Sequence, residues 1–289
     1  MQGYQQYLSD YQQYMLLKNY SKATLSAYSC ALRQFFKWHK KQQSGYVFHT
    51  THVRSYLALR YEQGLKWQTV NGDYSALLIF YQSVLRQAWE VEHLPRPRKE
   101  RTLPKVLSQE VVQKLIEHGQ TYKHQVYMSL LYATGLRLSE SLNLQLHHID
   151  GKRRQILVAC GKGAKDRYVD LPEQTLLLLR SYYRAYRPVS FLFYGTVTTQ
   201  AWATRSAQHA LQQAARKAKI IQKVSPHILR HCYATHHLEN GTNLVYLKQQ
   251  MGHANLKTTA RYIQVCQNYR QKVQHPVQNM DIQYQPHRR

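Results

Sequence analysis

The sequence predicts a mainly α-helical protein of two domains. Three observations lead to this prediction: apolar residues recur with helical spacing through the first 93 residues, a proline-rich basic segment then interrupts the pattern, and a second helical region follows with a single β-hairpin signal. The 289 residues are enough for two cores, and 43% apolar with 12% aromatic residues is the composition of a folded chain.

The N-terminal domain is predicted to span residues 1–94 as a helical bundle. Ser21 can cap a helix, because apolar residues follow it at spacings of three and four. Those residues are Leu25, Tyr28, Leu32, Phe35 and Phe36. A second helix is predicted between Thr51 and Gly64, and a third from about Thr69 to Glu90. Their apolar sides are expected to form the core of this domain.

Residues 95–105 are predicted to be a linker. The segment contains three prolines and carries a net charge of +4, and prolines at this density end helices and favour an extended chain. A basic extended chain is well suited to lie along a phosphate backbone. The candidate phosphate contacts in it are Arg96, Arg98, Lys99, Arg101 and Lys105.

The C-terminal domain is predicted to cover residues 106–289. A helix is expected to start at Ser108, and a buried helix covers roughly 126–132. The Ala-Thr-Gly sequence that ends at Gly135 interrupts this pattern, and a helix is predicted to resume over 136–146.

One β-hairpin is predicted within this domain. Its strands are Gln155–Val158 and Arg167–Leu171, and a Gly-Lys-Gly turn at 161–163 lies between them. Helical patterns fill most of the remainder, including Ala260–Val273, and a loose tail is expected after about residue 275.

The charge of the chain indicates a polyanionic partner. It has 40 Lys and Arg against 15 Asp and Glu, for a formal charge of +25. No acidic residue occurs between Glu173 and Glu239. A solvated face is the usual explanation for a short basic run, but an excess of this length favours a surface that faces phosphates.

Other classes of partner and compartment fit less well. The sequence has no apolar run of 18 residues and no signal segment within the first 17, so we expect no membrane association. The cysteines are scattered without a CxxC pair, which indicates reduced thiols in a cytoplasmic protein. They are Cys30, Cys160, Cys232 and Cys266.

A protein can break a phosphodiester without metal if it neutralises the non-bridging oxygens and supplies a nucleophile and an acid. Arginine suits the first task, because its planar fork binds phosphate through two hydrogen bonds and stays charged. A two-metal nuclease needs paired carboxylates, and the basic stretch from 174 to 238 contains none. We therefore expect neither a metal nor a cofactor.

The first segment suited to this chemistry runs from Thr134 to Glu140. Arg137 follows a glycine break at the start of a helix, where its side chain and free backbone N–H groups can meet a phosphate. Glu140 lies three residues further on the same helix face and can orient the arginine. By itself, an arginine at a helix start is more often a surface cation.

Two further segments complete the set. Ser225 and Pro226 suit the start of a helix, on which His227 and Arg230 share one face. The third segment is Gly252-His253, and Tyr262 follows nine residues after its histidine. Each segment is common alone, and a single tyrosine among 24 means little without the others.

Together and in this order, the segments resemble the tyrosine recombinase (phage integrase) family, and most of all its compact Xer-like or integron-integrase-like members. The matching motifs are ATGLRLSE at 133–140, GKGAKDR at 161–167, SPHILRH at 225–231 and MGHANLKTTARYIQV at 251–265. The N-terminal YSKATLSAYSCALRQFFKWH and the hinge ending in PKVLSQEVV also resemble family segments. The resemblance implies a two-domain clamp around duplex DNA.

The resemblance also implies roles for six catalytic residues. Arg137 and Arg230 would hold the scissile phosphate. Lys162, in the hairpin turn, would act as general acid, and Tyr262 would attack. His227 would manage the proton of the nucleophile, and His253 would bind a non-bridging oxygen. Lys165 and Arg167 are expected to contact DNA, and His231 to have a structural role.

The resemblance implies a site-specific recombinase that cuts and rejoins DNA through a 3′-phosphotyrosine, in a mobile element or in the resolution of chromosome dimers. It would act as a tetramer on paired DNA sites, with accessory proteins as possible partners. The alternatives are a catalytically silent DNA-binding regulator of the same fold and a relaxing enzyme like topoisomerase IB. Two other interpretations are weaker: the turn at 161–163 lacks the spacing of a P-loop, and Cys232 with His236 is only a partial zinc pattern.

Overall fold

The structure is a computed structural model that describes residues 2–42, 47–89, 96, 103–159 and 166–266. The chain divides into two compact units, Met1–Thr102 and Leu103–Arg289. The division falls inside the segment predicted as a linker. Each unit has a hydrophobic core of its own and is described by itself.

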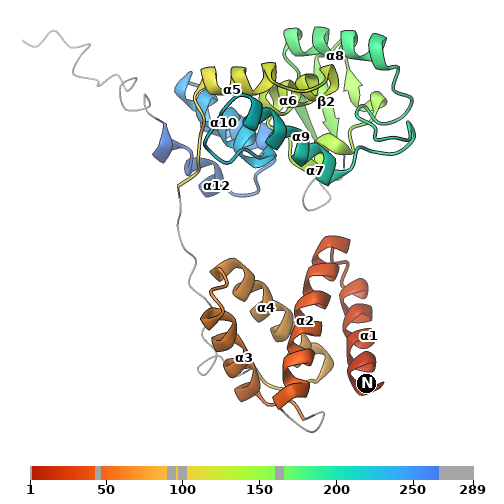
Figure 1. Ribbon diagram of the computed structural model, residues 1–289, viewed down its shortest axis with the longest axis vertical. Helices are drawn as coiled ribbons and strands as arrows, with labels where there is room; N and C mark the ends of the chain where they lie inside the picture. The colour runs from red at the N-terminus through yellow and green to blue at the C-terminus, as the bar shows by residue number, and fades with distance from the viewer. Residues whose placement is uncertain (1, 43–46, 90–95, 97–102, 160–165, 267–289) are drawn as a thin grey trace, which may run out of the picture. The chain divides into compact units, whose positions relative to one another are not determined.

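Unit 1 is a helical bundle (Figure 1). Its elements are α1 (Gln2–Leu17), α2 (Lys22–Gln42), α3 (Thr50–Glu62), α4 (Trp67–Ile79) and a π-helical turn, Phe80–Val84. The helix predicted after Ser21 is confirmed as α2, and the Ser21 hydroxyl accepts a hydrogen bond from the backbone N–H of Thr24. The core is aromatic: Tyr11, Phe35 and Phe80 are fully buried.

The third predicted helix is shorter in the structure than in the prediction. The prediction continued it to Glu90, whereas regular helix ends at Ile79 and the π-helical turn ends at Val84. The wider turn shifts the spacing of the side chains, and Arg86 then takes the left-handed conformation, with φ of 54°. A pattern of apolar residues does not report either change, so periodicity alone extended the helix past its end.

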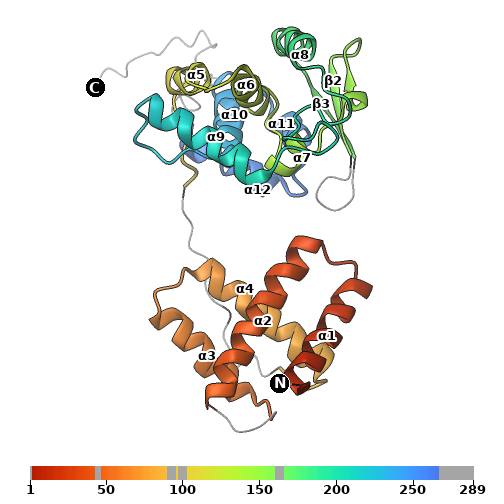
Figure 2. The ribbon, with the colours of Figure 1, turned by 45° about the vertical axis from the view of Figure 1, so that its right-hand side comes forward.

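Unit 2 contains the remaining helices and a small sheet (Figures 1 and 2). Its helices are α5 (Gln109–Glu117), α6 (Tyr122–Thr134), α7 (Leu138–Leu142), α8 (Glu173–Tyr186), α9 (Thr204–Lys217), α10 (Pro226–Glu239), α11 (Leu244–Met251) and α12 (Leu256–Ala260), with 3-10 turns at Leu146–His148 and Ile263–Val265. Helix α6 packs against both α8 and α10, which makes it the central helix of the unit. None of the described helices is long and apolar enough to cross a membrane.

The sheet has three antiparallel strands in the order β1 (Ile149–Asp150), β2 (Gln155–Val158) and β3 (Arg167–Asp170). The predicted hairpin is therefore confirmed, with Ile156 opposite Val169. Its turn, including the Gly-Lys-Gly sequence, lies outside the described residues. Helix α11 packs on β3, where the Gln250 side chain accepts a hydrogen bond from the backbone N–H of Asp170.

Two predicted helices in this unit are shorter than expected. The helix predicted over 136–146 is only Leu138–Leu142, because the backbone at Arg137 is extended and serves as the N-cap. The helix predicted over 260–273 does not form in its described part: α12 ends at Ala260, and Tyr262 precedes a 3-10 turn. The backbone N–H of Tyr262 bonds to Thr259, three residues back, so a tight turn replaces the helix.

Candidate active site

The fold brings together four of the six predicted catalytic residues from segments far apart in the sequence. Arg137 precedes α7, Arg230 lies on α10, His253 follows α11, and Tyr262 follows α12. Contacts connect three of them directly: Arg230 bonds to His253, and the His253 ring stacks near the Tyr262 ring, with centroids 6.4 Å apart. Arg137 is joined to the carbonyl of Gly252, the residue before His253. His227 is also on α10, three residues before Arg230, and its side chain is exposed.

Arg137 is held in place from two sides. Its Nη1 pairs with Glu140 Oε1 at 2.7 Å, and its Nη2 donates to the carbonyl of Gly252 at 3.0 Å. The backbone N–H of Arg137 also donates to Glu140 Oε2, at 2.8 Å. The predicted orientation of Arg137 by Glu140 is therefore confirmed, and 21% of the arginine side chain remains exposed to meet an anion.

Arg230 is almost completely buried, at 4% exposure. Its guanidinium donates to the carbonyls of Gly135 and Met251, and its Nη2 lies 3.1 Å from His253 Nε2. Burial, with the charge of Arg137, lowers its pKa to about 10, so the group stays charged at neutral pH. Since these bonds use three of the five N–H donors of an arginine, two donors remain for a ligand.

Glu140 is the central carboxylate of the site. It pairs with Arg137 and also with Arg167, whose Nη1 and Nη2 lie 2.9 and 2.8 Å from its two oxygens. Arg167 also donates to the carbonyl of Gln250. These contacts favour a supporting role for Arg167 over the DNA contact that the sequence predicted. With Arg230, three guanidinium groups face one carboxylate, so the cluster keeps a positive charge that can stabilise a phosphate.

The pairing of Glu140 is expected to contribute strongly to stability. Burial opposes its ionisation, but hydrogen bonds from Arg167 and Arg137 outweigh burial and lower the pKa of Glu140 to about 2. We expect Glu140→Gln to lower the free energy of unfolding by about 3 kcal/mol, because breaking a buried ion pair leaves its cations uncompensated. Chemical denaturation at neutral pH measures the loss. Glu173→Gln, at an ion pair whose side chains are 59% and 70% exposed, is the matched control and should cost little.

The pairing of Glu140 with Arg137 and Arg167 also predicts how the stability of the protein depends on pH. The pKa of Glu140 in the folded protein is below its ordinary value of 4.5, so its stabilisation is complete above that pH and is lost as the pH falls toward about 2. Denaturation measured over this window should show a steeper loss for the wild type than for Glu140→Gln. Parallel curves, or a neutral-pH stability equal to that of the wild type, would contradict the assignment of Glu140 as the central carboxylate.

The protonation of His253 follows from its partners. An arginine only donates, so Nε2 of His253 accepts from Arg230, and the proton of the neutral ring is on Nδ1, 2.9 Å from the Thr259 hydroxyl. Burial and the charges of Arg230 and Arg137 lower the pKa of His253 to about 4. His253 is therefore neutral at physiological pH when no anion is bound.

The Tyr262 side chain is buried, at 5% exposure, in an apolar cluster with residues of α10 and α11. Burial raises the pKa of its hydroxyl, and Arg230, Arg261 and Arg137 only partly offset this effect. Its Oη lies 3.0 Å from Nδ1 of His231. The sequence indicated only a structural role for His231 and did not reveal this contact, although its spacing of four from His227 places both on one face of the helix.

Although His227 is exposed to solvent as a residue, neighbouring atoms partly desolvate its ring, and this desolvation, with the charges of Arg230 and Arg137, lowers its pKa. The predicted part of His227 in proton transfer remains a prediction.

Two of the predicted DNA contacts in the linker lie within the described residues. Lys105 is exposed, and Arg96 bonds to Asn71 and Ser75 on α4. The predicted general acid, Lys162, lies outside the described residues. So do the remaining predicted DNA contacts, which are Lys165, Arg98, Lys99 and Arg101.

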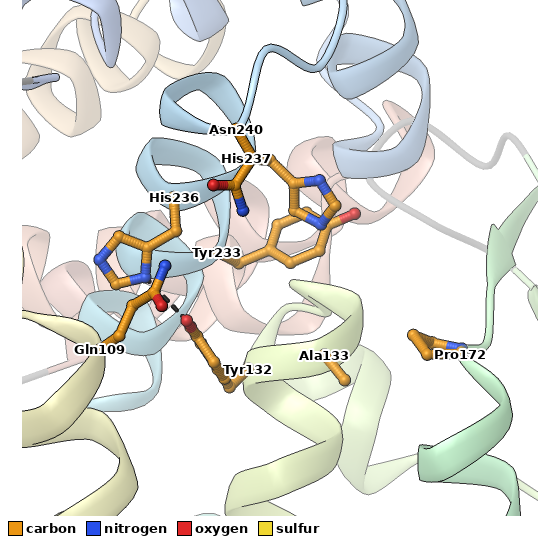
Figure 3. A pocket seen from close by; sticks show the side chains of 8 residues that line it. All are labelled: Gln109, Tyr132, Ala133, Pro172, Tyr233, His236, His237 and Asn240. Atoms are coloured by element: carbon orange, nitrogen blue, oxygen red, sulfur yellow. Dashed lines mark hydrogen bonds between the residues drawn. The ribbon is translucent and has the colours of Figure 1, made fainter. Parts of the chain in front are cut away.

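A separate cavity lies beside Tyr233 and His236 (Figure 3). It measures about 180 Å³ and is lined by Gln109, Tyr132, Ala133, Pro172, Tyr233, His236, His237 and Asn240. The Tyr132 hydroxyl bonds to His236 Nδ1 at 2.8 Å, as the dashed line shows.

The two residues of the partial zinc pattern, Cys232 and His236, have other partners in the structure. His236 bonds to Tyr132, and the Cys232 sulfur accepts a hydrogen bond from the backbone N–H of Leu107. Within the described residues, no group of three His, Cys, Asp or Glu side chains is placed to hold a metal ion.

Comparison with known proteins identifies the family. Residues 105–268 match the model of the phage integrase family, and residues 7–91 match the phage integrase N-terminal SAM-like domain. The chain belongs to the phage integrase family of tyrosine recombinases. The fold prediction is confirmed at the same time: a helical N-terminal domain and a catalytic domain with a small sheet.

The relatives agree with an Xer-like assignment. The tyrosine recombinase XerC of Staphylococcus haemolyticus is 32% identical over 274 residues, covering 89% of this chain and 91% of the relative. XerA of Pyrococcus furiosus is also 32% identical, with 89% of each chain covered. A crystal structure of XerA recombinase matches 93% of this chain at 25% identity, with a TM-score of 0.54. The XerH recombinase bound to its difH substrate matches 84% of this chain and 77% of that chain at 20% identity, with a TM-score of 0.69, and shares the fold.

Proposed function

We propose that this chain cuts and rejoins duplex DNA at specific sites, with Tyr262 as the nucleophile and a 3′-phosphotyrosine as the intermediate. The observation that carries the proposal is the convergence of Arg230 and His253 beside Tyr262, with Arg137 joined to the same place through the Gly252 carbonyl, 115 residues away in the sequence. Two anchored arginines and a buried hydroxyl provide two of the parts that metal-independent phosphodiester cleavage requires: neutralisation of the non-bridging oxygens and a nucleophile.

The chemistry follows from these positions. The Tyr262 oxygen attacks phosphorus, its proton is removed, and the 5′ oxygen of the next nucleotide leaves as a hydroxyl after it receives a proton. Arg137 and Arg230 stabilise the charge on the non-bridging oxygens. The new phosphotyrosine bond replaces the broken phosphodiester, so a 5′ hydroxyl can reverse the reaction without ATP.

The remaining family roles belong to the same proposal. Lys162 is the acid for the leaving oxygen, and His227 takes part in the removal of the Tyr262 proton. His253 has its lone pair on Nε2 when no DNA is bound, so it must gain a proton or change tautomer to donate to phosphate. A bound phosphate favours protonation, because its negative charge offsets the arginines that lower the pKa of His253.

The solved relatives support a proposal that DNA is the partner of this chain. XerH is described bound to difH, before and after cleavage, and a lambda integrase fragment as a dimer bound to a core site. We propose that this chain likewise binds duplex DNA at specific sites. We further propose that it assembles as a tetramer on paired sites, because exchange needs four strand cuts and each copy offers one Tyr262. Action in the cytoplasm and the help of accessory proteins are part of this proposal.

Trapping experiments test the proposed activity. Nicked DNA that contains a cognate site should yield a protein–DNA adduct that survives denaturant, and two such sites should exchange strands. A chain that binds DNA but forms no adduct would be a regulator of the same fold. A chain that forms adducts and relaxes supercoils, yet never exchanges strands between sites, would be a topoisomerase.

Binding to DNA should depend strongly on salt. The chain has a charge of +25, and a clamp that touches about 6–10 phosphates should lose roughly 10³–10⁵ in affinity between about 50 and 200 mM salt, through release of counterions. Fluorescence anisotropy over this range measures the slope of the logarithm of affinity against the logarithm of salt concentration. Lys105→Ala should reduce the slope by about one phosphate contact if this exposed lysine binds the backbone. A nearly flat dependence would show that the positive charge serves another purpose.

A further inference from the structure

The Tyr262 hydroxyl has His231 as its partner among the described side chains. Its Oη lies 3.0 Å from His231 Nδ1, and the two ring centroids are 5.5 Å apart. On this helix the resemblance gives catalytic roles to His227 and Arg230, whereas His231 was expected to have only a structural role. A buried hydroxyl with one polar partner takes its orientation from that partner.

We propose that His231 is a positioning residue, which fixes the Tyr262 hydroxyl for attack on the scissile phosphate by hydrogen bonding to it through Nδ1. This inference rests on the proposed nucleophilic function of Tyr262.

The surroundings of Tyr262 explain why a further contact is needed. Its backbone lies in a turn between α12 and the 3-10 turn at Ile263–Val265, so no regular helix fixes it. Apolar packing against Tyr233, Leu247 and Met251 holds the ring. Such contacts have no direction, so they leave the rotation of the O–H bond free. The hydrogen bond to His231 supplies this direction.

His231 is suited to orient the hydroxyl and poorly suited to take its proton. Burial, with the charges of His227, Arg230 and Arg261, lowers the pKa of His231 to about 4. At neutral pH the ring is therefore neutral, and it can keep a hydrogen bond to the phenol. A base with so low a pKa captures little of the proton of a phenol whose own pKa is raised by burial.

Two substitutions at position 231 separate positioning from proton transfer. His231→Ala removes the contact, whereas His231→Asn places an amide near the position of Nδ1 and keeps a hydrogen bond without a titratable group. In single-turnover cleavage of prebound DNA, Ala should slow the reaction about 10- to 100-fold, as expected for a misplaced reacting group, and Asn should restore most of the rate. DNA affinity should not change.

His237→Ala is the matched control on the same helix, since the His237 ring bonds to Thr242 and not to Tyr262. It should cleave at the rate of the wild type. The rates of the wild type and His231→Ala should run parallel with pH. If Asn is as slow as Ala, and the deficit closes as the pH rises, His231 is the proton acceptor and the positioning proposal is wrong. Wild-type cleavage by His231→Ala would also overturn it.

A second readout does not need cleavage, so it separates failure of this proposal from failure of the proposed function. The phenol ¹³Cζ resonance of Tyr262 can be assigned by its loss in Tyr262→Phe. Without DNA, it should shift in His231→Ala and return toward its wild-type position in His231→Asn. An unchanged resonance in His231→Ala would show that no hydrogen bond joins the two side chains, whether or not the protein cuts DNA.

Discussion

Tyr262→Phe is expected to bind its DNA site with near wild-type affinity and to form no covalent adduct. The substitution removes one oxygen, the proposed nucleophile, and leaves the ring in its apolar cluster. Its folding should therefore change little, whereas the intermediate cannot form. Binding is measured by anisotropy, and the adduct by electrophoresis under denaturing conditions after incubation with nicked DNA.

The control is Tyr269→Phe, in the same part of the chain, which should form the adduct normally. If Tyr262→Phe still forms an adduct and Tyr269→Phe does not, the nucleophile is Tyr269 and the proposed site is wrong. Loss of the adduct in both variants together with loss of binding would indicate a defect before chemistry, and circular dichroism and thermal melting would identify it.

Lys162→Ala is expected to cleave ordinary DNA about 10²–10⁴ times more slowly than the wild type, the loss typical of a missing general acid. An alkoxide is a poor leaving group and needs a proton, whereas a thiolate leaves without one. The variant should therefore recover most of its rate on DNA in which sulfur replaces the 5′ bridging oxygen. Arg137→Ala should not recover, because Arg137 acts on the non-bridging oxygens.

Lys165→Ala is the neighbouring control in the same hairpin turn, where both lysines lie outside the described residues. If sulfur rescues Lys165→Ala but not Lys162→Ala, Lys165 is the acid and the alignment of the turn must shift. If sulfur rescues neither variant, the acid lies elsewhere in the site, and His227 and His253 are the next candidates.

The sequence predicted much of this fold, because local signals determine the elements concerned. Ser21 marks the start of α2, and two short runs rich in β-favouring residues, Gln155–Val158 and Arg167–Leu171, with a glycine turn between them, mark the hairpin. Helix ends were predicted less well. The extended backbone at Arg137 and the left-handed Arg86 are backbone conformations that apolar periodicity does not report, so the residue pattern around them did not reveal where the helices begin and end.

The candidate site was predicted through motifs, and their convergence could be seen only in three dimensions. Spacing along the chain related Glu140 to Arg137, three residues away, and that pairing is confirmed. Spacing could not show that Arg167, from a strand 27 residues after Glu140, would pair with the same carboxylate. Nor could it show that His231 contacts the Tyr262 hydroxyl, because that contact depends on the turn after α12.

The most direct test of the central claim is to identify the residue that becomes attached to DNA. Wild-type protein is trapped on nicked DNA, digested with trypsin and nuclease, and analysed by tandem mass spectrometry. Cleavage after Arg261 and Arg270 gives the peptide YIQVCQNYR, which contains both Tyr262 and Tyr269. Tyr262 alone should carry the nucleotide mass. A nucleotide on Tyr269, or on a peptide from elsewhere in the chain, would contradict it.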